Sequence, residues 1–267
     1  MSVQEDLIFD LGAHLGEDSA FYLRLGYRVV AVEANPELAA RLRRRFSSEI
    51  AAGKYTLVEA AIAATAGDVT FYKNEKLSVW GTTQPAWAAR NERLGARSTT
   101  LTVRGVRFLG LVEQYGCPHY LKVDIEGADM LCIHALKELA LPPVYVSLES
   151  TKTSWEELLR EFDALEGLGY SKFKVVNQRR HRTGMFVARN GSAVSYEFEP
   201  GASGPFGENL AGAWLTRAEA LSIYRRVYRL YRFFGDDAVL AKFLRRFPLT
   251  RGLLRYVGWY DTHAYRP

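Results

Sequence analysis

Short runs of β-branched and apolar residues alternate with segments of helical periodicity over the first three quarters of the chain. The runs that predict strands are LIFDLG, RVVAVEA, YTLVEAAI, DVTFYK, YLKVDIEG, PVYVSLE, KFKVV and GMFVAR. Apolar residues three to four positions apart predict amphipathic helices at residues 19–25, 36–50, 128–139 and 153–168. Such alternation is typical of βαβ units. We therefore expect an α/β fold in which about seven mostly parallel strands form a sheet with helices on both faces.

Two stretches interrupt this alternation. Residues 81–98 are polar and aromatic without a clean period, and we interpret them as an excursion over the carboxyl edge of the sheet. The Gly- and Pro-rich stretch PGASGPFGENLAG then breaks regular structure near residues 200–212. A capping box formed by Thr216 and Glu219 begins an amphipathic, arginine-rich helix after it. The sequence thus predicts a domain at residues 1–200 and a helical carboxyl-terminal extension at residues 201–267.

The composition supports a folded protein of a reducing compartment. The chain has 267 residues, of which 48% are hydrophobic, and this is enough apolar material for a large core. Its two cysteines, Cys117 and Cys132, are too few for a disulfide framework or a zinc cluster, so we expect buried thiols. The amino terminus is acidic where a signal peptide would be basic, and no run of 18 apolar residues occurs. We expect a cytoplasmic protein without a transmembrane segment.

The positive charge is concentrated in the last fifth of the chain. Residues 1–216 carry 24 Lys and Arg against 26 Asp and Glu, whereas residues 217–267 carry 11 against 4. A protein that binds nucleic acid through its main domain would spread basic residues over that domain. We therefore expect no nucleic-acid partner.

The first predicted strand ends in DLGAHLG and passes directly into a helical pattern. In open parallel sheets, ligands bind beyond the carboxyl ends of the strands, where Gly12 would let the backbone approach the ligand. Glu33 ends the next strand, 21 residues after Gly12, where a carboxylate can accept hydrogen bonds from both ribose hydroxyls. The two features together predict a nucleoside ligand.

The spacing of the first loop discriminates between two nucleoside cofactors. The dinucleotide pattern G-x-G-x-x-G would place Gly12, His14 and Glu17 at its three positions, and a carboxylate at the third would lie beside the pyrophosphate. NAD is therefore disfavoured. The pattern D-x-G-x-x-x-G, matched by Asp10, Gly12 and Gly16, suits a ligand that carries an ammonium group and no phosphate. This chemistry indicates S-adenosylmethionine.

The chain resembles the FkbM family of S-adenosylmethionine-dependent methyltransferases. Four blocks carry the resemblance: LIFDLGAHLGE, VVAVEANPELAARLRR, VEAAIAATAGDVTFY and YLKVDIEGAD, the last being similar to the family signature LKIDVEGAE. They extend from residue 7 to about residue 150. The resemblance implies a Rossmann-like class I methyltransferase sheet, S-adenosylmethionine as cofactor, and methyl transfer to a hydroxyl of a small acceptor such as a sugar or a natural-product intermediate.

The resemblance also implies a set of cofactor contacts. It places Asp10, Gly12 and Gly16 at the methionine end, Glu33 at the ribose and Ala61 at the adenine. The family commonly has Asn where this chain has His14, so His14 either donates a hydrogen bond in place of the amide or caps the following helix.

Asp124 and Glu126 end the central strand, and the resemblance implies that they face the transferred methyl group as the catalytic pair. Such carboxylates can take a proton from the acceptor hydroxyl, bind a divalent cation or position the acceptor. Asp124 can alternatively hold only its own loop through backbone hydrogen bonds. Glu149, at the end of the next strand, is a further candidate for this group, and His181 and His263 are candidate bases.

Two other functions are weighed against small-molecule methylation. The arginines and tyrosines of the extension suggest a nucleic-acid methyltransferase, but the central strand ends in DIEG instead of N-P-P-Y, and Cys117 precedes that strand where a cytosine-type nucleophile would follow it. A non-catalytic nucleotide-binding module is the third possibility, and the intact acidic positions argue against it. The basic helix of the extension can pack on the parent domain with a solvated charged face, or bind an anionic acceptor or a membrane surface. We expect the extension, with Phe206 and Trp214, to cover the acceptor site. Residues from Ala202 onward should then be dispensable for cofactor binding, provided that the remaining domain folds.

Overall fold

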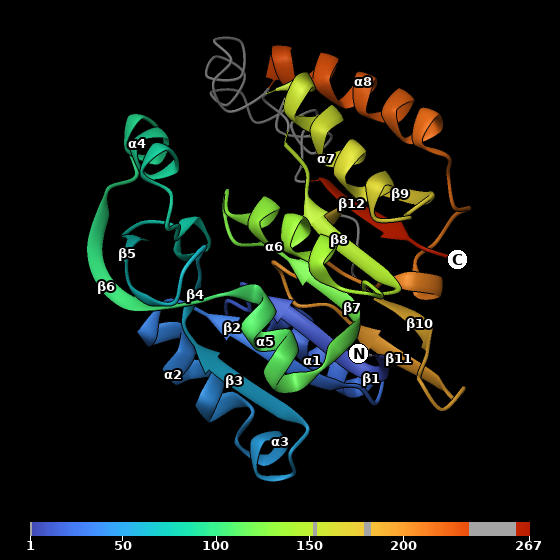
Figure 1. Ribbon diagram of the computed structural model, residues 1–267, viewed down its shortest axis with the longest axis horizontal. Coiled ribbons are helices and arrows are strands. Elements are labelled where there is room, and N and C mark those ends of the chain that lie inside the picture. Colours follow the sequence, from blue (N-terminus) through green and yellow to red (C-terminus); the bar gives the residue numbers. More distant parts are fainter. Residues whose placement is uncertain (1, 152–153, 179–182, 235–259) are drawn as a thin grey trace.

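A seven-stranded sheet forms the centre of the molecule (Figure 1). The computed structural model describes residues 2–151, 154–178, 183–234 and 260–267. The strand order is β3-β2-β1-β7-β8-β12-β9. These strands are β1 (Val3–Leu11), β2 (Arg28–Glu33), β3 (Tyr55–Glu59), β7 (Cys117–Val123), β8 (Tyr145–Glu149), β9 (Lys172–Asn177) and β12 (Tyr260–Tyr265). Neighbouring strands pair in parallel except at β12, so the expected mostly parallel sheet is confirmed.

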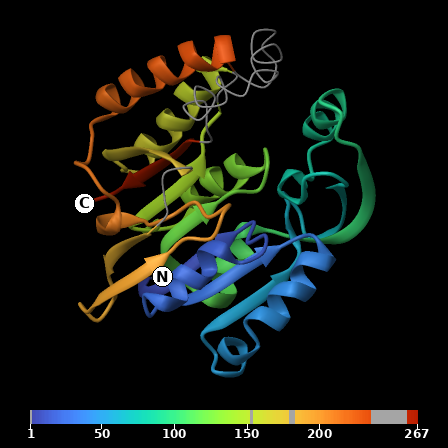
Figure 2. The same ribbon diagram turned by 180° about the vertical axis from the view of Figure 1, so that it is seen from behind.

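Helices cover both faces of the sheet, as the alternation of elements predicts (Figures 1 and 2). One face lies under α5 (Phe108–Tyr115), α6 (Asp129–Ala135), α7 (Trp155–Gly167) and α8 (Arg217–Phe234). The other lies under α1 (Glu17–Arg24), α2 (Pro36–Arg45) and the hairpin β10 (Thr183–Val187) to β11 (Ala193–Glu197), with α3 (Ser47–Ala51) following α2. In β1, Phe9 and Leu11 belong to the first core and Ile8 to the second, because successive strand side chains point to opposite faces.

Two predicted strands lie outside the central sheet. DVTFYK is part of β5 (Gly67–Asn74), which forms a three-stranded sheet with β4 (Ala61–Ile62) and β6 (Ser98–Val106). GMFVAR is part of the separate β10–β11 hairpin. β6 escapes sequence-based prediction because its outward positions are threonines and an arginine, and α4 (Pro85–Arg93) lies within the stretch interpreted as an irregular excursion.

The predicted boundary at residue 200 does not separate two folding units. β12 belongs to the segment assigned to the helical extension, yet it lies between β8 and β9 and is antiparallel to both. Thr262 and Ala264 are fully buried there. Both faces of β12 are covered by other parts of the protein, so its polar residues are buried together with its apolar ones. The sequence of β12 therefore lacks the apolar pattern by which a strand is predicted. The extension therefore completes the sheet.

Phe206 and Trp214, which we expect to cover the acceptor site, both pack against aromatic residues of the sheet. Phe206 is buried and stacks on Tyr120 with ring centroids 4.2 Å apart. Trp214 stacks on Tyr145, the first residue of β8, and contacts Tyr265, the last residue of β12. These residues mark the amino ends of the parallel strands, whereas ligands of open α/β sheets bind at the carboxyl ends.

The other general expectations concern the cysteines and the membrane. Cys117 and Cys132 are both free thiols in the interior, as predicted. Within the ranges that the structure describes, the helices lack the length and apolar character needed to cross a membrane.

Candidate active site

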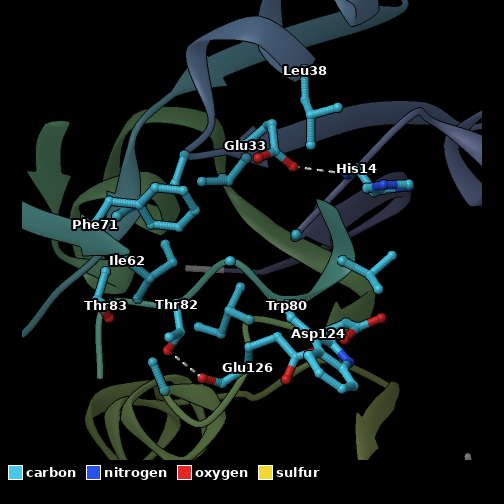
Figure 3. A pocket seen from close by; sticks show the side chains of 18 of the residues that line it. His14, Glu33, Leu38, Ile62, Phe71, Trp80, Thr82, Thr83, Asp124 and Glu126 are labelled. Atoms are coloured by element: carbon cyan, nitrogen blue, oxygen red, sulfur yellow. Dashed lines mark hydrogen bonds between the residues drawn. The ribbon is translucent and has the colours of Figure 1, made fainter. Parts of the chain in front are cut away.

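Two adjoining cavities lie at the carboxyl ends of the central strands. The first is lined by residues that follow β1, β2, β3 and β7, and Figure 3 shows it from close by. The second, of about 580 Å³, lies between the end of β8, the helices α6 and α7, and the excursion that contains α4. Four residues line both cavities: Trp80, Asp124, Glu126 and Glu149. The geometry thus provides two binding spaces that meet at a group of carboxylates.

Glu33 lies in the first cavity where β2 ends. Its side chain accepts a hydrogen bond from the backbone N–H of His14 at 2.8 Å (Figure 3). It also accepts one from the backbone N–H of Asn35 at 2.8 Å. Burial raises the pKa of Glu33 to about 7 despite these two hydrogen bonds. A buried carboxyl held in this way has lone pairs left over for ligand hydroxyls, because each oxygen accepts more than one hydrogen bond.

The wall opposite Glu33 is apolar. Ala61 begins β4 and is buried, and it lines the first cavity together with Ile62 and Phe71. Leu38 of α2 approaches from the other side (Figure 3). Apolar walls of this kind suit the flat ring of a nucleobase.

Gly12 is required by the closeness of two strand ends. Its φ of 82° lies in the left-handed region, and an added Cβ would lie 1.8 Å from the carbonyl oxygen of Asp124. The backbone N–H of Asp124 donates to the carbonyl of Leu11 at 3.0 Å, which holds the end of β7 against the first loop. Gly12 lines the first cavity, so the close approach also shapes the cavity floor.

Asp10 and Gly16 line neither cavity. Asp10 is fully buried in β1, where the Ser19 hydroxyl donates to it at 2.6 Å. Gly16 has a positive φ, and its missing Cβ makes room for Phe46 and Leu42 on the core side. Both residues thus support the first loop from the core side, and their expected place at the methionine end stays a prediction.

Lys122 is a site residue that sequence analysis missed. Its ammonium lies 3.3 Å from Asp10, 3.4 Å from Asp18 and 3.5 Å from Asp124. Burial alone would lower the pKa of Lys122, but the three carboxylates outweigh it and raise that pKa well above its usual value. The signal in the sequence is a lysine within the apolar run YLKV of the central strand. Lys122 thus holds the Asp124 side chain in place, and its positive charge compensates the negative charges of the buried Asp10 and Asp18.

His14 joins the two walls of the first cavity. One ring nitrogen lies 3.0 Å from a Glu17 carboxylate oxygen, and the other lies 2.8 Å from the hydroxyl of Ser78 in η1 (Ser78–Trp80). Its φ of 50° is unusual for a residue other than glycine. The ring therefore ties the β1–α1 loop to the excursion. His14 also lines the first cavity, and its contact with the cofactor stays a prediction.

The excursion docks on the turn that follows β7. The Thr82 hydroxyl donates to the Glu126 carbonyl at 2.7 Å (Figure 3). The indole of Trp87 in α4 lies so close to Gly127 that a Cβ there would be 2.1 Å from the indole nitrogen. Residues 80–83 line the first cavity, and Trp80 and Trp87 line the second, so this stretch does lie over the carboxyl edge.

Three carboxylates meet where the cavities join. Oxygen atoms of Asp124, Glu126 and Glu149 all lie within 4.8 Å of one another. Glu126 has a left-handed backbone, with φ 48°, at the sharp turn after the strand. Three partly exposed acids at this separation can hold a cation or accept a proton from a neighbouring hydroxyl.

Of the two candidate histidines, the structure describes His263 alone, and His263 does not lie at this junction. His263 is buried within β12, where its ring stacks on Tyr120, and it lines neither cavity. His181 lies outside the residues that the structure describes. Of the four described residues that line both cavities, three are therefore acidic and the fourth is Trp80.

The strand order defines a Rossmann-like class I methyltransferase fold, because one antiparallel strand is inserted next to the edge of an otherwise parallel sheet. The first cavity lies at the carboxyl ends of the parallel strands, as this fold requires. The family model described as the methyltransferase FkbM domain matches residues 10–172. The chain thus belongs to the FkbM family of S-adenosylmethionine-dependent methyltransferases.

The comparison with solved structures gives matches of low sequence identity and low TM-score, among them three methyltransferases. Precorrin-6Y C5,15-methyltransferase from Geobacter metallireducens has 15% sequence identity and a TM-score of 0.37, with 73% of this chain and 77% of that chain covered. The C-terminal domain of the enzyme of the same name from Rhodobacter capsulatus has 11% identity and a TM-score of 0.38, with 74% and 78% covered. An S-adenosylmethionine-dependent methyltransferase from Thiobacillus denitrificans, in complex with S-adenosylhomocysteine, has 10% identity and a TM-score of 0.36, with 99% and 86% covered. A search of curated proteins gives no match.

Proposed function

We propose that this protein transfers a methyl group from S-adenosylmethionine to a hydroxyl of a small acceptor, such as a saccharide or a natural-product intermediate. The observation that carries the proposal is the pair of adjoining cavities that meet at Asp124, Glu126 and Glu149. One cavity has the strand-end Glu33 opposite an apolar wall, which suits a nucleoside. The other offers separate space for an acceptor.

The residues of the first cavity fit the cofactor. Glu33 would accept hydrogen bonds from the ribose hydroxyls, and the wall of Ala61, Ile62 and Phe71 would contact the adenine. When bound, S-adenosylmethionine supplies an electrophilic methyl group. The chain's main contribution is alignment, since holding two reactants in line can supply roughly 7–11 kcal/mol of the barrier.

The carboxylates at the junction would act on the acceptor hydroxyl. Asp124, held by Lys122 and by the end of β1, and Glu126, held by Thr82, would accept the hydroxyl proton or orient the hydroxyl. A divalent cation held by the same oxygens is the other means by which this group could activate a hydroxyl.

Replacing Glu33 by Ala should weaken the binding of S-adenosylhomocysteine about 10- to 100-fold, because a charge-assisted hydrogen bond contributes about 1.5–3 kcal/mol. Isothermal titration calorimetry measures this change. The matched control is Glu59→Ala, since Glu59 pairs in register with Glu33 on β3 but is exposed and bound to Arg43. Equal affinity of a folded Glu33→Ala variant and the parent would contradict the assignment of Glu33.

The affinity for 5′-methylthioadenosine should rise as the pH increases through 7 and then level off. Burial raises the pKa of Glu33 to about 7, so the carboxyl is protonated below this pH and ionised above it. The ribose hydroxyls donate better to the ionised form, and this ligand has no ammonium group to add its own titration. A Glu33→Gln variant should show a flat profile between pH 6 and pH 8. A flat profile in the parent would argue against a ribose contact.

A further inference from the structure

Helix α8 presents a basic face to solvent. Arg225, Arg226 and Arg229 are exposed, and Leu230 beside them is 41% exposed. Residues three and four apart lie on the same side of a helix, so these four form one continuous surface, which we call the arginine face. The opposite side of α8 is anchored in the core by Tyr224, which is fully buried. The arginine face therefore plays no part in packing α8 on the sheet.

The three arginines of this face have no acidic partners. Residues 220–234 contain four arginines and no Asp or Glu. Arg217, in the first turn of α8, forms ion pairs with Asp163 and Glu166 of α7. Within the described ranges of the chain, by contrast, no carboxylate forms an ion pair with an arginine of the arginine face. The surface thus carries three positive charges that the described residues leave uncompensated.

The neighbouring helix does not supply the missing negative charge. α7 lies beside α8 (Figures 1 and 2), and Trp155 packs edge-on against Tyr228 with ring centroids 5.3 Å apart. Arg225 lies over the same Trp155 ring, with its guanidinium carbon 5.7 Å from the centroid. Glu156, the next residue of α7, is bound to Arg160. The border of the arginine face toward α7 is therefore an aromatic ring and a carboxylate that is already paired.

The position of α8 makes this surface accessible to a large partner. The helix forms the outer layer on its side of the molecule (Figures 1 and 2). A flat partner can therefore reach the whole arginine face at once. Tyr231, the residue after Leu230, lines the second cavity. The helix thus connects the surface to that cavity.

We propose that the arginine face docks this protein on an anionic lipid surface. Charge complementarity is the first reason, because each basic residue near an anionic membrane strengthens binding about 5-fold. Leu230 is the second reason, since an apolar side chain among arginines can enter the boundary between headgroups and acyl chains. A nucleic acid offers phosphates but no such apolar layer. The docking does not depend on the methyl transfer proposed above.

The test measures binding of the full-length protein to sedimented lipid vesicles. One set of vesicles contains phosphatidylcholine with phosphatidylglycerol as one lipid in three, and the other contains phosphatidylcholine alone. We expect binding to the anionic vesicles and little binding to the neutral ones. Added salt should weaken the binding, because it screens charges that are exposed to solvent.

A triple variant separates the arginine face from the net charge of the protein. Arg225→Gln, Arg226→Gln and Arg229→Gln together should weaken binding to the anionic vesicles about 100-fold. The matched control replaces three exposed arginines of α2 by glutamine: Arg41, Arg43 and Arg44. It removes the same charge from a helix on the other side of the sheet, so it should bind as the parent does. Melting curves of both variants check folding.

The apolar part of the surface distinguishes lipid from nucleic acid. Leu230→Ser should weaken vesicle binding a few-fold, because it removes the side chain that enters the lipid. A parent protein that does not bind the anionic vesicles would overturn the proposal, and so would equal binding by the two folded triple variants. Binding to a short DNA duplex that is lost with the arginines, without binding to vesicles, would identify a nucleic-acid partner and overturn the lipid assignment.

Discussion

A chain that ends at residue 259 should fail to fold, with no cooperative thermal transition and no binding of S-adenosylhomocysteine. The deletion removes β12, which lies between β8 and β9; it pairs with β9 along its whole length and with β8 from Asp261 to Tyr265. The loss exposes the cores on both sides of the sheet and leaves two strands without partners. Such a loss exceeds the roughly 5–15 kcal/mol by which domains are stable. Circular dichroism during heating, together with calorimetry, measures both effects.

The control for this deletion is a chain that lacks only the exposed Pro267, which should melt and bind as the parent does. The expectation from the sequence, that residues from Ala202 onward are dispensable for cofactor binding, is contradicted by the place of β12 in the sheet. A soluble protein ending at residue 259 that melts cooperatively and binds S-adenosylhomocysteine normally would show that β12 is not required.

Asp124→Asn and Glu126→Gln should each lower the turnover of any accepted acceptor by about 10²- to 10⁴-fold, the range typical of a lost acid–base group. The physical reason is their position, since both line the two cavities at their junction. Affinity for S-adenosylhomocysteine should change by only a few-fold. Asp124 also lies 3.5 Å from Lys122, so melting curves are needed to show that the Asp124→Asn variant is folded. Full turnover in both variants would remove the catalytic role.

The same assay separates the two ways in which these carboxylates could act. If Asp124, Glu126 and Glu149 hold a divalent cation, a chelator should abolish turnover and added magnesium should restore it. If a carboxylate takes the proton directly, turnover should be indifferent to the chelator. The amide variants lose activity in both cases, so the chelator distinguishes the two mechanisms.

Much of the cofactor half of the site follows from the sequence. Gly12, Glu33 and Asp124 each follow or end a strand with a strong apolar pattern, and the ends of parallel strands meet at one edge of a sheet. Glu33 and Ala61 accordingly lie in the same cavity, and Glu149 joins the two predicted catalytic acids. Local pattern is sufficient here because it fixes both the strands and their direction.

The tertiary structure decided what depends on contacts between distant segments. β12 contains Asp261, Thr262 and His263, polar residues that appear unsuited to a buried strand until β8 and β9 enclose them. Asp10 matched a cofactor motif, but the burial of Lys122 beside it makes it part of an internal ion cluster.

The second cavity likewise exists only in the folded chain. Its walls come from the end of β8, from α6 and α7, and from the excursion that contains α4, which are far apart in the sequence. Sequence by itself determined the parallel strands of the central sheet, the family and the cofactor edge, because these follow from local periodicity and short motifs. Only the tertiary structure decided the last strand, the ion cluster and the second cavity, because burial and pairing are properties of segments brought together by folding.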